Sequence, residues 1–107
     1  MKLTRIDASH PLFEASFTLY EASFPPNERR MREDHLRALQ DADFSPLGAV
    51  EDGMLLADVF LWETEDFCYL EHFAVQPSLR GHGTGSTILR QLLTQDKPLI
   101  LEIEPPE

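Results

Sequence analysis

The sequence predicts a mixed α/β domain whose elements follow the order β-α-α-β-β-β-α-β. Three observations support this class. Two helical stretches lie in the first 40 residues, an Asp-Gly turn then joins two apolar strands, and a strand, a glycine-rich loop and a helix lead into a last strand. The turn joins antiparallel strands, whereas the strand-helix-strand unit pairs its strands in parallel through a right-handed crossover. The chain is therefore expected to form one mixed sheet flanked by helices.

The first 40 residues are expected to hold a short strand and two helices. Residues 2–7 alternate apolar and polar side chains, as a strand does. Ser9 can cap the first helix, Pro25-Pro26 ends it, and Asn27 can cap a second helix that runs to residue 39. The first helix carries aromatic residues at helical spacing: Phe13, Phe17, Tyr20 and Phe24. We expect this aromatic stripe to pack in the core and the charged side of the second helix to face solvent.

The central part of the chain predicts three strands. Residues 47–51 and 54–62 flank the turn Asp52-Gly53, and residues 69–75 follow. In the second strand, apolar residues alternate over two faces: Leu55, Ala57, Val59 and Leu61 on one, and Leu56, Phe60 and Trp62 on the other. A strand that is apolar on both faces is typically central and covered on both sides. A helix around residues 88–93 and a strand over 99–104 complete the order.

A glycine-rich loop lies between the strand 69–75 and the following helix. Gly81, Gly83 and Gly85 let the backbone turn tightly, and the free N–H groups at the start of the helix favour an anion. A Walker loop would need a lysine after Gly85, which is absent. A dinucleotide fingerprint would need glycine in place of Ser86, although Glu102 has the expected spacing. A nucleotide-binding oxidoreductase fragment therefore remains one alternative.

A third motif fits better. The segment Arg80-Gly81-His82-Gly83-Thr84-Gly85 resembles the Arg/Gln-x-x-Gly-x-Gly/Ala motif of the GNAT superfamily of N-acetyltransferases. The preceding Phe73-Ala74-Val75-Gln76-Pro77 is similar to the end of the fourth strand of that family, and Phe24-Pro25-Pro26-Asn27-Glu28-Arg29 resembles a joint between its first two helices. The family usually continues with another helix and two strands. The resemblance thus implies that residues 1–107 form a single GNAT-like domain, C-terminally truncated relative to the family.

The resemblance also implies a binding site for acetyl-CoA. In the family this loop holds the pyrophosphate, which here implies the residues Arg80, Gly81, His82, Gly83, Thr84, Gly85 and Ser86. By the same resemblance, the backbone of Phe73, Ala74 and Val75 pairs with the pantetheine arm. An N–H group of this strand would face the thioester oxygen, where negative charge develops during acyl transfer.

Glu71 is the candidate catalytic base. Several family members carry a Glu or His at this place, and a carboxylate can take the proton of an attacking amine directly or through a water. Strand alternation places His72 on the opposite side from Glu71 and Tyr69 on the same side. The implied activity is N-acetylation of a small-molecule or peptide amine by direct attack on acetyl-CoA. In the family, a tyrosine on the helix after the fifth strand commonly protonates the departing thiolate. Residues 1–107 include no such helix, so this chain is expected to bind acetyl-CoA better than it turns it over.

Composition narrows the possible partners. The chain has 19 acidic and 9 basic residues and a formal net charge of -10, which argues against nucleic acid and is compatible with a cationic amine. Cys68 is the only cysteine, and no cluster has zinc spacing. No signal peptide or apolar run of about 20 residues is present, which predicts a cytoplasmic protein without a membrane partner. The apolar strand 99–104 predicts that the chain either associates as a homodimer through this strand or is a fragment of a longer domain. A non-catalytic module that binds CoA or a protein is the main alternative.

Overall fold

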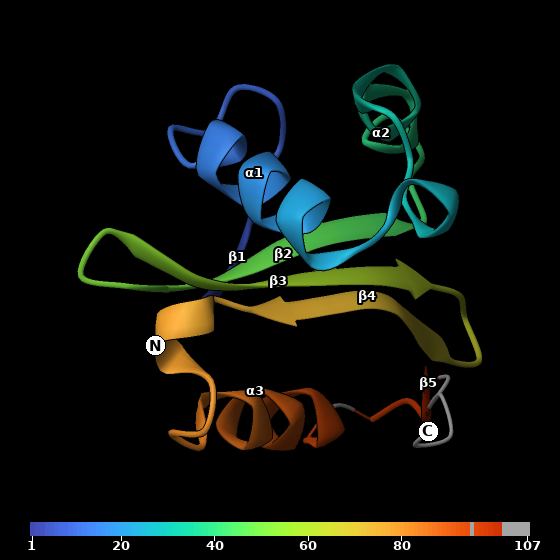
Figure 1. Cartoon of the computed structure of the whole chain (residues 1–107). Coiled ribbons are helices and arrows are strands. Elements are labelled where there is room, and N and C mark those ends of the chain that lie inside the picture. The colour runs from blue at the N-terminus through green and yellow to red at the C-terminus, as the bar shows by residue number, and fades with distance from the viewer. Residues whose placement is uncertain (95, 102–107) are drawn as a thin grey trace.

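The computed structural model of the chain describes residues 1–94 and 96–101 (Figure 1). The described elements follow the predicted order, and two short 3-10 turns interrupt it. They are β1 (Lys2–Arg5), α1 (Phe13–Ser23), η1 (Pro26–Glu28), α2 (Arg32–Ala38), β2 (Phe44–Glu51), β3 (Met54–Glu63), β4 (Cys68–Val75), η2 (Pro77–Leu79), α3 (Thr84–Leu93) and β5 (Leu99–Leu101). Residues 102–104 of the predicted last strand lie outside the described part, as does Glu102 of the dinucleotide alternative.

One sheet organises the described residues. Its strands lie in the order β1-β2-β3-β4-β5, with antiparallel pairs except for the parallel pair of β4 and β5. Figure 1 shows α1 and α2 on one face of the sheet and α3 on the other. This arrangement confirms the predicted mixed sheet with a central strand, β3, that is covered on both sides. None of the helices in residues 1–94 and 96–101 is long and apolar enough to span a bilayer.

The core has one layer on each face of the sheet. The layer under α3 contains Ala49, Ala57, Val59, Leu61, Leu70, Ile88 and Leu92. Two adjoining clusters lie under α1 and α2: Ile6, Phe13, Leu19, Leu55 and Ala74 in one, and Phe17, Tyr20, Phe44 and Phe60 in the other. The first three rings of the aromatic stripe are buried, and Phe24 packs beside them. The prediction that the stripe is core is therefore confirmed.

A β-bulge makes the two faces of β3 differ from the predicted ones. Ala57 pairs with Ala49 and Leu55 pairs with Val50, so Leu56 is an extra residue between two paired positions. An extra residue reverses the alternation of side chains beyond it. Leu55 accordingly packs under α1, and Leu56 packs against the layer under α3. The expectation that Leu55 shares a face with Ala57 was wrong because the alternation is not continuous.

Two helix starts also differ from the prediction. Leu12 stands at the N-cap of α1 without a side-chain cap, because the hydroxyl of Ser9 bonds to Asp7 instead. The second helix begins at Arg32, after η1 and an extended stretch from Arg29 to Met31. Asn27 therefore caps no long helix. The extended stretch leaves the helical pattern, which lets Arg30 turn toward the sheet.

Candidate active site

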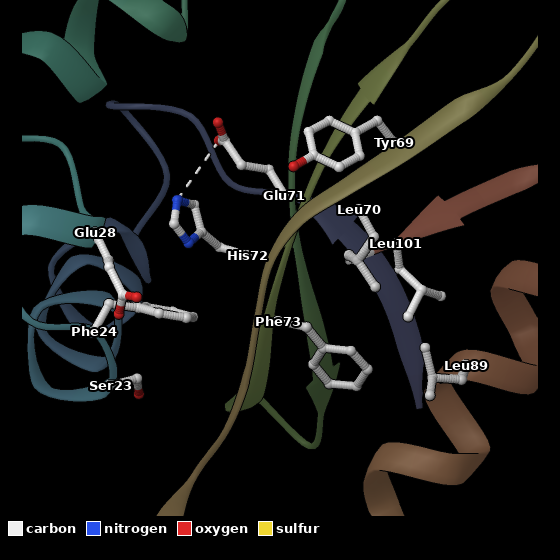
Figure 2. A pocket seen from close by; sticks show the side chains of 10 residues that line it. All are labelled: Ser23, Phe24, Glu28, Tyr69, Leu70, Glu71, His72, Phe73, Leu89 and Leu101. Carbon is white, nitrogen blue, oxygen red and sulfur yellow. Dashed lines mark ion pairs between the residues drawn. The ribbon is translucent and has the colours of Figure 1, made fainter. Parts of the chain in front are cut away.

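The site begins where β4 and β5 separate. In the described part of the chain, β5 pairs only with residues 68–70 of β4, whose residues 71–75 have a strand neighbour on the β3 side alone. A cleft of about 640 Å³ opens along this free edge. Figure 2 shows the residues that line it: Ser23, Phe24, Glu28, Tyr69, Leu70, Glu71, His72, Phe73, Leu89 and Leu101. The cleft thus reaches from α1 and η1, past the edge of β4, to α3 and β5.

A second bulge determines where Glu71 points. His72 pairs with Phe60 and Leu70 pairs with Leu61, so Glu71 is the extra residue of β4. The carboxylate therefore lies on the same side as the imidazole of His72, whose Nε2 is 3.8 Å from Glu71 Oε1 (Figure 2). Sequence alternation had placed the two side chains on opposite sides, and that expectation was wrong because of the bulge.

Arg30 is the partner of Glu71, and the sequence did not reveal it. Its Nη1 donates a 2.5 Å hydrogen bond to Glu71 Oε1, and the two side chains are only 20% and 25% exposed. The guanidinium lies 5.0 Å from the ring centre of Phe44 and 5.8 Å from that of Tyr20. The hydroxyl oxygen of Tyr20 also accepts the backbone N–H of Arg30 at 2.7 Å. Arg30 was expected on a solvated helix face, and this expectation was wrong.

The aromatic side of the site holds two histidines. The Nε2 atom of His72 lies 3.4 Å from the Tyr20 hydroxyl, and its ring meets the ring of Phe24 edge-on at 4.6 Å. Burial lowers the pKa of His72. The negative charge of Glu71 raises this pKa, and the positive charge of Arg30 lowers it further. Burial, with a contribution from Arg30, lowers the pKa of His35 to about 4. Both imidazoles are therefore neutral at pH 7, and the cationic group beside Glu71 is Arg30.

The glycine-rich loop leads directly into the start of α3. Gly81 and Gly83 adopt positive φ angles of 83° and 79°, which other residues rarely adopt. Gly83 is the N-cap of α3, and its carbonyl accepts the N–H and the hydroxyl of Thr87, each at 3.0 Å. The first N–H groups of a helix have no acceptor within it. Those of Thr84, Gly85 and Ser86 are therefore available at the positive end of the helix dipole.

Arg80 and His82 border this loop. The Nε of Arg80 donates to the carbonyl of Val75 at 3.2 Å, and its side chain is exposed. His82 is exposed and lines a smaller hollow of about 190 Å³ together with Gly83 and Thr84. A methyl group added at Gly85 would lie 3.6 Å from Val75, so the first turn of α3 packs directly on β4. The structure thus brings the loop 80–86 next to the free edge of β4.

The backbone of residues 73–75 presents this edge. The N–H of Gln76 donates to the carbonyl of Leu56 in β3 at 2.9 Å. Because N–H groups alternate in direction along a strand, those of Phe73 and Val75 point away from β3, toward the free edge. The N–H of Ala74 points to β3 by the same alternation, and its side chain is buried under α1. The edge therefore offers two of the three predicted residues as hydrogen-bond partners.

Other chemistry has less support in residues 1–94 and 96–101. No three His, Cys, Asp or Glu side chains gather there in a way that could hold a metal ion. Cys68 is buried, and this burial raises the pKa of its thiol, which disfavours a thiolate nucleophile. The fold and the site together define an α/β domain with a glycine-rich loop at a helix start, beside an open strand edge and a carboxylate.

Comparison with known proteins identifies the family. Residues 10–100 match the model of the acetyltransferase (GNAT) family. This chain therefore belongs to the GNAT acetyltransferase family. A GNAT-family acetyltransferase from Bacteroides thetaiotaomicron has a similar structure, with a TM-score of 0.90 and 28% identity over 99% of this chain. The chain spans 62% of the length of that protein. No curated protein gives a significant match in sequence.

Two further solved structures share the fold at lower identity. The ribosomal-protein-alanine N-acetyltransferase from Brucella melitensis biovar Abortus 2308 has a TM-score of 0.67 and 19% identity, over 97% of this chain and 81% of its own. An aminoglycoside 6'-N-acetyltransferase complexed with coenzyme A has a TM-score of 0.65 and 15% identity, over 86% of this chain and 53% of its own. At these identities the likeness concerns the fold.

Proposed function

We propose that this chain binds acetyl-CoA along the free edge of β4 and transfers the acetyl group to an amine, with Glu71 as general base. The observation that carries the proposal is the cleft lined by residues 69–73 of β4. It holds Glu71 on its wall, and the glycine-rich loop follows the same strand after η2. Family membership supports the same reaction class.

The pyrophosphate of acetyl-CoA would occupy the loop 80–86. The N–H groups at the start of α3 and the terminal guanidinium nitrogens of Arg80 supply donors to it, while Nε of Arg80 remains on Val75. His82 lies at the same loop and can add a ring N–H. The pantetheine arm would extend along Phe73, Ala74 and Val75, using the outward N–H groups of Phe73 and Val75.

The reaction requires a neutral amine next to the thioester carbonyl. The amine nitrogen forms the new C–N bond, Glu71 accepts the proton that it loses, and the C–S bond breaks to release the thiolate, which takes a proton from solvent water. An N–H of the free edge would stabilise the oxyanion between these steps. Oε1 of Glu71 is held by Arg30, whereas Oε2 has no hydrogen bond to another described residue and can accept the proton.

The acceptor is proposed to be a cationic amine, either a small molecule or a peptide N-terminus. Glu28 and Glu71 both line the cleft, and the chain carries a formal charge of -10. Charge complementarity of this kind favours the approach of a cation. The structures with the same fold include enzymes named for aminoglycosides and for a ribosomal-protein alanine, which suggests both classes as probes. The cytoplasm is the proposed location.

Calorimetry with acetyl-CoA tests the cofactor site. Arg80→Ala removes a charged hydrogen bond worth about 1.5–3 kcal/mol, so affinity should fall roughly 10- to 100-fold. Gly83→Val should abolish binding, because valine is strained at positive φ and crowds the phosphate. The controls are Arg90→Ala on the exposed side of α3 and Gly53→Val, which has a similar φ of 75° in the β2–β3 turn. Unchanged affinity in both loop variants, or binding of NAD instead, would refute the site.

Transfer assays test the activity. The acceptors are sisomicin, which is bound in the structure of an aminoglycoside acetyltransferase of the same fold, and a peptide with an N-terminal alanine. Release of the CoA thiol is followed between pH 6 and 9. Glu71→Gln keeps the shape of the side chain but removes the proton acceptor, so the rate should fall about 10²- to 10⁴-fold at neutral pH and recover partly at high pH. Tight binding of acetyl-CoA without transfer to any amine would favour the non-catalytic module. A parent rate and pH profile in the variant would show that Glu71 is structural.

A further inference from the structure

A charged pair connects the acceptor side of the cleft to the bulge of β4. Arg30 comes from the extended stretch between η1 and α2, whereas Glu71 is the extra residue of β4, 41 positions later in the chain. Both side chains are more than half buried, and the donor and acceptor atoms are 2.5 Å apart. A hydrogen bond between two ionised and partly desolvated groups is stronger and more directional than one between neutral groups.

The arginine is held in place independently of the glutamate. The hydroxyl oxygen of Tyr20 accepts its backbone N–H, and its guanidinium packs over the rings of Phe44 and Tyr20. Tyr20 and Phe44 are fully buried core residues. The cation is therefore part of the packed structure, and Glu71 meets it at a preset position.

We infer that Arg30 is the positioning residue for Glu71: it holds Oε1 and leaves Oε2 for the acceptor amine. The inference rests on the proposed role of Glu71 as base. A base must be correctly aimed before the amine arrives. Arg30 fixes the carboxylate through one contact, and no described lysine or second arginine makes an ion pair with Glu71.

Other titratable groups around Glu71 are His72, His35 and Tyr20 on the aromatic side, and Glu28 and Tyr69 line the same cleft. The two imidazoles are neutral at pH 7, and desolvation raises the pKa of the Tyr20 phenol. None of them replaces the positive charge of Arg30 near neutral pH.

Arg32 offers a matched control. It also forms an ion pair with a glutamate, Glu14, and its guanidinium lies 4.9 Å from the ring centre of Phe17. That pair is more exposed, at 46% and 73%, and neither residue lines the cleft. Arg32→Gln therefore removes a stacked, paired arginine of the same chain segment without touching the proposed machinery.

The test combines unfolding and kinetics. The thermal midpoints of the parent, Arg30→Gln, Glu71→Gln and the double variant at pH 7 show whether the two substitutions are coupled. We expect a coupling of about 5 °C, since each kcal/mol shifts the midpoint of a domain this size by roughly 4–8 °C. A purely apolar packing role of Arg30 would give no coupling with Glu71→Gln. The corresponding cycle of Arg32 with Glu14 should give a coupling of less than about 2 °C, as exposed pairs do.

Acetyl transfer to sisomicin supplies the second readout. Arg30→Gln should lower kcat roughly 10-fold and leave the KM for acetyl-CoA near the parent value, because a carboxylate that is no longer held in place accepts the amine proton less efficiently. Arg30→Lys, which keeps a cation at this position, should lose less than Arg30→Gln, and Arg32→Gln should match the parent. An unchanged kcat in Arg30→Gln, or no coupling at pH 7, overturns the inference. Coupling in a protein that transfers no acetyl group supports the ion pair and counts against the proposed function.

Discussion

Asp58 provides a direct test of the packing between α1 and the sheet. Its side chain is fully buried on β3, where the hydroxyl of Ser16 in α1 donates a 2.6 Å hydrogen bond to Oδ1. The other oxygen, Oδ2, is buried without a hydrogen-bond partner among the described residues. Desolvation raises the pKa of Asp58 from 3.8 to about 8, although the hydrogen bond from Ser16 acts in the opposite direction.

The direction of the effect on stability follows from proton uptake. Between pH 4 and 8 the unfolded chain releases a proton that folded Asp58 keeps, so the free energy of unfolding falls as the pH rises. At 1.36 kcal/mol per pH unit, the full window corresponds to on the order of 5 kcal/mol. This is a large share of the roughly 5–15 kcal/mol that stabilises a typical domain.

His35 opposes this trend on the acidic side. Burial, with help from Arg30, lowers its pKa from 6.5 to about 4, so the unfolded chain binds a proton in this window that folded His35 does not. That difference makes stability rise with pH from 4 to 6.5 and nearly cancels the slope from Asp58. The lowered pKa of His72 acts in the same direction as His35. The parent protein should therefore lose about 2 kcal/mol, mainly between pH 6.5 and 8.

Asp58→Asn should remove this loss. Urea unfolding at pH 4, 5, 6.5 and 8 should show the variant gaining about 3 kcal/mol up to pH 6.5 and staying level to pH 8. The shape of the profile is the readout, because the amide also carries an unpaired buried group that shifts the whole curve. Asp52→Asn, at an exposed turn, is the control and should follow the parent. A variant that still loses about 2 kcal/mol from pH 6.5 to 8 would refute the reasoning.

Two further predictions concern packing and association. Gly48→Ala should lower the free energy of unfolding by about 1–3 kcal/mol in urea titrations. The new methyl group would lie 2.3 Å from Ile6 Cδ1 and 2.7 Å from Leu55 Cδ1, so the core must shift. A variant as stable as the parent would contradict this prediction. Ile100 and Leu101 of β5 are 47% and 39% exposed, so light scattering should show a dimer. The double variant Ile100→Glu/Leu101→Glu should be a monomer. A parent protein that stays monomeric at all concentrations would contradict this prediction.

The elements and the glycine-rich loop could be predicted because their requirements are local. Hydrophobic periodicity indicates α1 and α3, and the Asp-Gly turn indicates the β2–β3 hairpin. Only glycine adopts the positive φ of Gly81 and Gly83 readily, and a helix start follows at once. The residues of the proposed phosphate site are neighbours in sequence, so their arrangement needs no distant contact.

The surroundings of Glu71 could not be predicted, because they depend on contacts between distant segments. The side to which Glu71 points depends on the register of β4 against β3, and a one-residue bulge reverses it. The position of Arg30 depends on an extended stretch that interrupts the expected helix. Local charge patterning favours a solvated helix there, and only packing over Tyr20 and Phe44 overrides it.

These two irregularities act together. The bulge alone would turn a carboxylate toward the aromatic cluster, where an unpaired charge is costly to bury. The extended stretch alone would bury a guanidinium beside Tyr20 and Phe44 without a counter-ion. Each irregularity makes the other energetically acceptable, because the contact between Arg30 and Glu71 pairs the two opposite charges. The geometry of the proposed base therefore depends on the whole segment from η1 to α2, and transferring a catalytic glutamate by its position in β4 alone would omit the cation that orients it.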